Sequence, residues 1–227
     1  MIKTWPCTLP DGKVSEELVV WYGASNADNI LIIPPLFDEH NKMRRQLIEV
    51  MRRLAEGGVD SQLPDLSGWN ESLAPLEEQT LAFWREAVIE AAQTLRTSRF
   101  LAVRSGALLA PSLMRGWLYA PQTGPKLLRG MIRARIFSNK EAGRTETSEA
   151  LHERGRAEGL MLSGWPIGPE MFRELETADI ADSENHSVIE QSQIGGAGLW
   201  LRAEPSEDPR QADALATTIL EDLAKPI

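Results

Sequence analysis

The chain has 227 residues, 42% of them hydrophobic, with one cysteine and a formal net charge of −9 at pH 7. This length and apolar content predict one globular domain over residues 1–227, and a lone cysteine excludes a disulfide scaffold. No apolar run is long enough to span a bilayer, and the N-terminus lacks a basic start followed by an apolar stretch. We therefore expect a cytoplasmic protein without a transmembrane segment.

Strands and helices alternate along the first half of the chain. The apolar stretch 29–35, NILIIPP, is typical of a strand buried on both faces. Apolar residues at helical spacing then predict an amphipathic helix from Asn41 to Glu56. The other expected elements are strands at 18–22, 59–66, 99–103 and 116–121 and helices at 76–95 and 106–114. This alternation predicts an α/β fold with a mainly parallel central sheet and helices on both faces.

The pattern loosens after Pro121. We expect helices at 126–137 and 149–158 and interpret residues 122–176 as a small helical lid insertion, because insertions at the carboxyl ends of strands cover the ligand crevice in this class. The first of these helices could equally be one that covers the sheet. Two last strands are expected at 187–193 and 198–202, and Asp208 followed by Pro209 predicts the start of a C-terminal helix.

Basic residues are concentrated in one part of the chain. Between Glu90 and Glu141 the sequence contains no acidic residue but many lysines and arginines. This block predicts an electropositive face for phosphate, an acidic glycan or a lipid headgroup, unless its charges pair with acids from elsewhere. The acidic remainder argues against nucleic acid. Three scattered histidines and one cysteine predict no metal site, and we expect no cofactor.

Residues 100–110, FLAVRSGALLA, predict a strand that turns sharply into a helix. An α/β-hydrolase carries its nucleophile on such a turn, in the pattern small-x-nucleophile-x-Gly. Ala102 and Gly106 fit the small positions, with Arg104 at the tip. A frame shifted by one residue puts Ser105 at the tip but requires a valine in a tight position. We favour the first frame, in which an always protonated arginine replaces the nucleophile.

Three stretches of the sequence together resemble one known family. They are ILIIPPLFDEHNKMRRQLIEVMRRLAEGGVDSQLPDLSGWNES, AVRSGALLA and GWLYAPQTGPKLLRGMIRARI. They are similar to the exosortase A system-associated hydrolase type 2 proteins of bacteria that make exopolysaccharide. The similarity covers residues 29–175 and, more thinly, the C-terminal helix. It implies an α/β-hydrolase-like fold and, by the family's name, a hydrolase.

A serine hydrolase needs a nucleophile, a base and backbone donors for the oxyanion. The catalytic candidates are Ser105, in the shifted frame, and His40, which follows the loop expected to supply an oxyanion donor. A loop histidine is also commonly a hydrogen-bonded bystander. In this fold the base follows the last strand, and the stretch GGAGLWLRAEPSEDP contains no histidine. No complete triad can therefore be written.

The remaining polar residues favour binding. Arg104 would point into the crevice above a helix N-terminus, which prefers an anion. The predicted ligand-binding residues are Arg104, Leu36, Phe37, Asp38, Glu39 and Asp65, with Arg129 and Arg133 on the rim. Alternatively, Asp38 or Glu39 neutralises Arg104. Two hypotheses follow: a pseudoenzyme that binds an anionic small molecule, a glycan- or lipid-linked ligand or a partner, and an active esterase-like serine hydrolase that uses Ser105.

Overall fold

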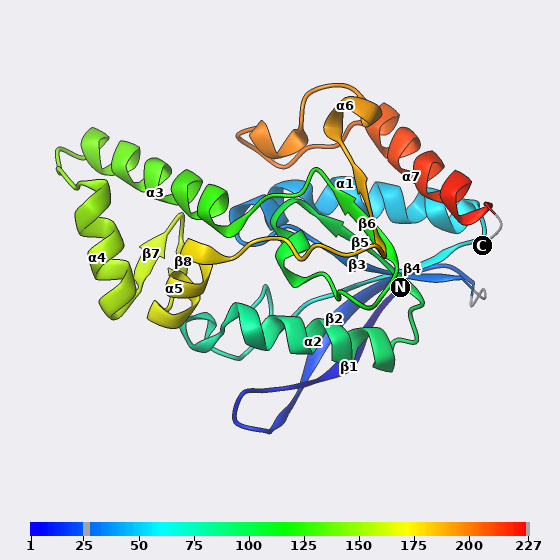
Figure 1. Cartoon of the computed structure of the whole chain (residues 1–227), viewed down its shortest axis with the longest axis horizontal. Helices are drawn as coiled ribbons and strands as arrows, with labels where there is room; N and C mark the ends of the chain where they lie inside the picture. Colours follow the sequence, from blue (N-terminus) through cyan, green and yellow to red (C-terminus); the bar gives the residue numbers. More distant parts are fainter. Residues whose placement is uncertain (25–27, 226–227) are drawn as a thin grey trace.

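The computed structural model describes residues 1–24 and 28–225 and has a seven-stranded sheet at its centre (Figure 1). The strand order is β1-β2-β4-β3-β5-β6-β9. The last five strands of this order are parallel to one another. At the other edge, β2 pairs antiparallel with both β1 and β4. The strands are β1 (Ile2–Thr8), β2 (Val14–Tyr22), β3 (Asn29–Ile33), β4 (Asp60–Pro64), β5 (Arg99–Val103), β6 (Gly116–Tyr119) and β9 (His186–Ile189).

Helices cover both faces of this sheet. Helices α1 (Asp38–Glu56) and α7 (Pro209–Leu223) lie together on one face, and α2 (Leu81–Thr94) lies on the other (Figure 1). The mainly parallel α/β fold predicted from the alternating pattern is therefore confirmed. Short helices fill the connections: η1 (Leu76–Glu78), η2 (Arg104–Leu109), α6 (Gln191–Ile194) and η3 (Leu199–Leu201).

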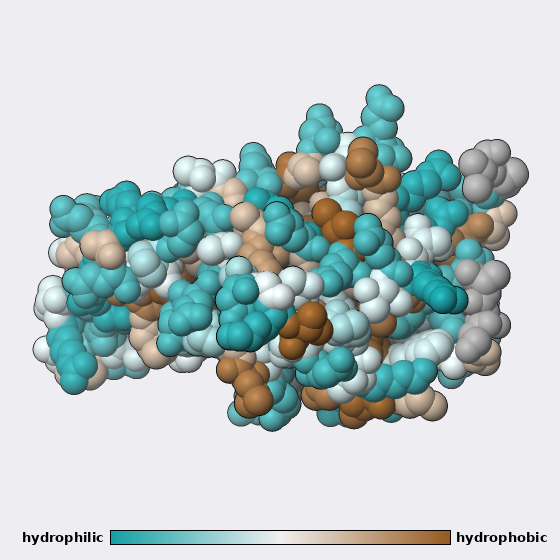
Figure 2. Space-filling view, turned by 90° about the horizontal axis from the view of Figure 1, so that it is seen from below, coloured by the Kyte–Doolittle hydropathy of each residue, from teal (hydrophilic) through white to brown (hydrophobic). Residues whose placement is uncertain are grey.

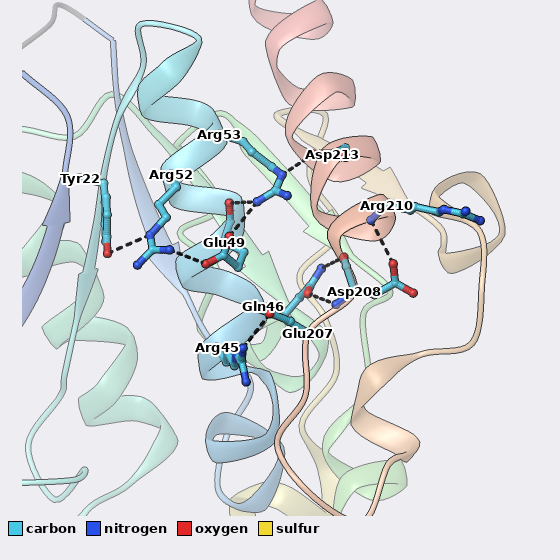
Figure 3. Close-up of polar contacts among 10 residues, drawn as sticks. All are labelled: Tyr22, Arg45, Gln46, Glu49, Arg52, Arg53, Glu207, Asp208, Arg210 and Asp213. Atoms are coloured by element: carbon cyan, nitrogen blue, oxygen red, sulfur yellow. Dashed lines mark hydrogen bonds and ion pairs between the residues drawn. The ribbon is translucent and has the colours of Figure 1, made fainter.

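Helix α1 shows why the sequence folds this way locally. Its apolar stripe, which includes Met43, Leu47 and Val50, is buried against the sheet, while its outer face pairs with α7. Figure 3 shows Arg53 of α1 reaching Asp213 and Gln46 bonding the backbone of the residue that caps α7. The helix begins at Asp38, three residues before the predicted start, because two carboxylates in its first turn favour the positive end of the helix dipole.

The connection between β6 and β9 forms a unit that projects from one side of the sheet, at the left of Figure 1. Its elements are α3 (Gly124–Glu141), α4 (Ser148–Glu158), β7 (Leu160–Leu162), β8 (Trp165–Ile167) and α5 (Pro169–Thr177). We call these five elements the projecting unit. It corresponds to the segment interpreted as a lid, and its action as a lid within a single 227-residue domain stays a prediction. None of the described helices is long and apolar enough to cross a bilayer.

The structure adds one strand to the expected elements and corrects three of them. Strand β1 was not expected, because its pattern of mostly exposed residues around Pro6 is that of an edge strand. The expected strand at 198–202 is the 3-10 helix η3, and the one at 187–193 ends at Ile189. The expected helix at 106–114 is the short η2. Short apolar runs do not distinguish strand from helix by periodicity alone.

The surface on the α2 side is largely hydrophilic (Figure 2). Apolar side chains lie there in separate groups between polar ones rather than as one continuous sheet of apolar surface.

Candidate functional site: the elbow after strand β5

The turn that follows β5 has the backbone of a nucleophile elbow. Arg104 comes directly after the strand and has a positive φ of 54°, a region that non-glycine residues rarely adopt. Two residues later, a Cβ on Gly106 would lie 2.4 Å from the Pro34 oxygen and 2.6 Å from the Ile33 oxygen. Only glycine permits this approach between the elbow and the end of β3. The strained tip position is therefore occupied by Arg104.

The Arg104 guanidinium is bound by the protein itself. Its Nε and Nη2 donate to the two carboxylate oxygens of Glu39, at 3.0 and 3.3 Å, and its Nη1 donates to the Ala120 oxygen at 2.9 Å. The guanidinium carbon lies 4.2 Å from the ring centroid of Trp200. The side chains of Arg104 and Glu39 are 14% and 16% exposed. This geometry matches the alternative prediction, in which Glu39 neutralises Arg104. The prediction that a free Arg104 guanidinium faces an anionic ligand is therefore wrong.

Ser105 does not face a crevice. It is fully buried, and its Oγ accepts a hydrogen bond from the backbone N–H of Leu36 at 2.9 Å. Leu36 belongs to the loop after β3, where this type of fold takes an oxyanion donor. The protein therefore already uses that donor to hold the serine hydroxyl. Phe37 next to it contacts the Trp84 and Trp165 rings and is buried.

His40 lies in a polar cluster near the end of β4, not against Ser105. Its Nε2 accepts from Arg44 Nη1 at 3.0 Å, and its ring meets the Trp69 ring edge to face. Burial, together with the Arg44 charge, lowers the pKa of His40 to about 3, so the imidazole is neutral at pH 7. The buried Asp65 carboxylate accepts from Arg44 and Asn70, and burial raises its pKa. Within this cluster, Arg44 and Asn70 are the donors to the Asp65 carboxylate and the His40 Nε2.

The other two histidines lie elsewhere. His186 begins β9 opposite the first residue of β6, so it is at the amino edge of the parallel strands, away from the elbow, and it bonds the Pro111 oxygen. His152 belongs to α4 and bonds Glu176 at 2.6 Å. In the part of the chain that the structure describes, no histidine side chain forms a hydrogen bond with Ser105.

The remaining predicted ligand residues are divided between two places. Asp38 forms an ion pair with Lys42 one turn along α1. Arg129 and Arg133 line a cleft inside the projecting unit that does not include Arg104. Arg104 is bound by Glu39 and does not line this cleft, so the expected ligand site with Arg104 at its floor and these arginines on its rim is corrected. The single electropositive surface of the basic block stays a prediction.

Sequence reasoning missed the residues that surround Arg104 from the later part of the chain. Trp200 lies over the guanidinium, and it also meets the ring of Tyr119, the last residue of β6. Burial raises the pKa of Tyr119 to about 12, and its hydroxyl bonds Gln191. The apolar residues around Trp200 indicated a buried segment. They did not indicate that the Trp200 ring would lie over the Arg104 guanidinium.

Solved structures share this architecture. No protein-family profile matches the chain, and no curated protein sequence matches it. Est1E of Butyrivibrio proteoclasticus, solved with ferulic acid bound, is similar at 16% identity and a TM-score of 0.60, over 96% of this chain and 99% of that one. Rv0554 of Mycobacterium tuberculosis is similar at 14% identity and a TM-score of 0.55, over 98% of both chains. Mouse alpha/beta hydrolase domain-containing protein 10 is similar at 15% identity and a TM-score of 0.52, over 98% of both chains.

These likenesses, together with the mostly parallel sheet and the elbow after β5, define an α/β-hydrolase fold. At such identities they show the fold alone. The chemistry of the chain depends on the residues at its elbow.

Proposed function

We propose that this chain is an α/β-hydrolase-fold protein that has lost acyl-transfer chemistry and binds an anionic, glycan-linked or lipid-linked ligand. Its sequence resemblance suggests a role in the exopolysaccharide and exosortase systems of bacteria. The observation that supports the loss of acyl-transfer chemistry is the Arg104–Glu39 ion pair at the elbow tip. A guanidinium stays protonated and is no nucleophile.

The neighbouring groups agree with this interpretation. An acyl-transfer site needs a hydroxyl that can reach a substrate carbonyl and a base that can take its proton. Ser105 is fully buried and its oxygen is held by Leu36. His40 has a pKa of about 3, which makes it a very weak base at neutral pH.

The second candidate is an esterase-like serine hydrolase that uses Ser105, and the presence of an esterase-type elbow favours it. Ser105 would have to break its bond to Leu36 and turn towards the crevice, and a base would have to move next to it. The described side chains provide no such base in the present arrangement.

Fluorophosphonate labelling separates the two functions. The wild type should show no covalent adduct in intact-mass spectra and no turnover of p-nitrophenyl butyrate above that of Ser105→Ala. Arg104→Ser places a hydroxyl at the tip itself and should stay inactive, because no base accompanies it. Stoichiometric labelling of the wild type at Ser105, lost in Ser105→Ala, would establish the esterase instead.

A further inference from the structure

A cleft lies within the projecting unit, between α3, α4 and α5, and encloses about 400 Å³. Its volume falls in the range of about 300–1,000 Å³ that is usual for small-molecule sites. Side chains of all three helices line it, among them Arg129 and Arg133 of α3, Ser148 and His152 of α4, and Glu176 of α5.

The floor of the cleft is apolar. Leu128, Ile132 and Ile136 are four residues apart along α3, so they follow one face of that helix. The first two are buried in the core and the third is half-buried. Leu128 and Ile132 therefore form the apolar base of the cleft, and Ile136 is the more accessible apolar side chain beside it.

The rim of the cleft carries two arginines that have no partner in the chain. Arg129 and Arg133 lie one turn apart on α3, are exposed, and form no hydrogen bond or ion pair with any residue in 1–24 or 28–225. Four other arginines on these helices contrast with them. Arg135 and Arg154 pair with Glu146, Arg156 pairs with Glu176, and Arg173 pairs with Glu170.

The one acidic lining residue does not neutralise these two arginines. Both His152 Nδ1 and Arg156 Nη1 contact the same Glu176 oxygen, at 2.6 and 3.3 Å. The cleft therefore joins an apolar strip to two unpaired guanidinium groups. Guanidinium groups bind phosphate and carboxylate by paired, charge-assisted hydrogen bonds.

We propose that this cleft binds an anionic amphiphile, with its alkyl chain against the apolar lining from α3 and its phosphate or carboxylate head between Arg129 and Arg133. The proposal rests on the binding part of the proposed function and names the ligand class and the site. It does not depend on whether the elbow is catalytic.

Isothermal titration calorimetry with single-chain probes, each kept below its critical micelle concentration, tests the ligand class. Decyl phosphate and decanoate should bind with one site per chain, and the comparison of the two identifies the preferred head group. Decyltrimethylammonium and decanol should bind at least tenfold more weakly, because they lack the negative charge. Inorganic phosphate alone should bind weakly, because it lacks the chain.

Variants test the site. The double variant Arg129→Met/Arg133→Met should weaken decyl phosphate binding about a hundredfold, since a hydrogen bond to a charged group is typically equivalent to about a tenfold change in affinity. Arg210→Met is the matched control. Arg210 is an exposed arginine on α7 whose guanidinium forms no ion pair with the described residues, and only its backbone N–H bonds Asp208. The affinity of this variant for decyl phosphate should equal that of the wild type. Ser148→Trp should obstruct the cleft without altering its charge and should also weaken binding.

Three results would overturn the proposal. They are equal affinity for the cationic and anionic probes, unchanged affinity in the double variant when its circular dichroism matches that of the wild type, and binding to anionic vesicles without binding to monomeric amphiphiles. The last result would indicate a membrane-surface interaction. Esterase turnover found at the elbow would contradict the proposed loss of catalysis and leave these titrations unaffected, so the two failures are distinguishable.

Discussion

The hydroxyl of Ser105 accepts the backbone N–H of Leu36 at 2.9 Å, across 69 residues of sequence. The bond ties the elbow after β5 to the loop after β3. In a working hydrolase the two segments would leave their N–H groups free for a substrate oxygen. Here the serine side chain takes one of them, so this residue acts as a structural link between the two loops.

Ser105→Ala should therefore lower stability without affecting any esterase signal. The change leaves the buried Leu36 N–H without an acceptor, which typically costs about 1–3 kcal/mol. Urea unfolding followed by circular dichroism measures the loss. Ser138→Ala on the exposed face of α3 is the control, with an expected effect under about 0.5 kcal/mol. An unchanged unfolding midpoint for Ser105→Ala would show that the bond is not structural.

The Arg104–Glu39 pair should behave as one unit. Glu39→Gln leaves a mostly buried guanidinium without its carboxylate and should cost about 3 kcal/mol. Arg104→Met should cost less than that, and the double variant should cost clearly less than the sum of the two, with a coupling of at least about 1 kcal/mol. Asp11→Asn, which breaks the exposed pair with Lys13, should be nearly neutral. Strict additivity at Arg104 and Glu39 would contradict a direct pair.

Gly106→Ala should be among the most destabilising small substitutions in the chain. Its Cβ would lie 2.4 Å from the Pro34 oxygen, and backbone atoms cannot move aside cheaply. We expect a loss of more than about 2 kcal/mol, or no soluble folded protein. Gly130→Ala is the matched comparison, because a Cβ at that position in α3 meets nothing within 4 Å. It should raise stability by about 0.5–1 kcal/mol through helix propensity. Equal thermal midpoints for the two variants would contradict the close approach at the elbow.

His40 predicts a loss of stability in mild acid. Its pKa falls from 6.5 in the unfolded chain to about 3 in the folded protein, so the unfolded state binds the proton first. The stability contribution is complete above pH 6.5 and declines as the pH falls towards about 3. Between pH 7 and 5.5 the wild type should lose about 1 kcal/mol through this group.

The comparison for this prediction is His40→Gln, which removes the titrating group and keeps an acceptor for Arg44. Its stability should depend less on pH over the same interval, whatever its stability at pH 7. Denaturant unfolding at four pH values between 7 and 5.5 measures both slopes. Parallel slopes would mean that His40 does not carry the effect.

Local sequence patterns predicted much of the fold. Continuous apolar runs such as Asn29–Ile33 and Arg99–Val103 belong to strands that are covered on both faces, and helical spacing identified α1 and α7. Side chains on such elements have to be apolar wherever they face the core, so periodicity records burial. The cap at Asp208 was also predicted, because capping depends on neighbours within one helical turn. The edge strand β1 escaped detection because most of its residues are exposed to solvent.

By itself, the sequence determined the position of the elbow, since small residues two positions before and after Arg104 are a local requirement of the strained turn. It also determined that no histidine follows the last strands. Only the tertiary structure decided what surrounds that tip. Glu39 lies 65 residues away along the chain, and Trp200 comes from beyond β9. The sequence gives the number of cationic and carboxylate side chains. Which of them form pairs depends on which loops meet at the carboxyl edge of the sheet. That is also why Arg104 is neutralised within the protein while Arg129 and Arg133, on a helix that projects from the sheet, remain unpaired.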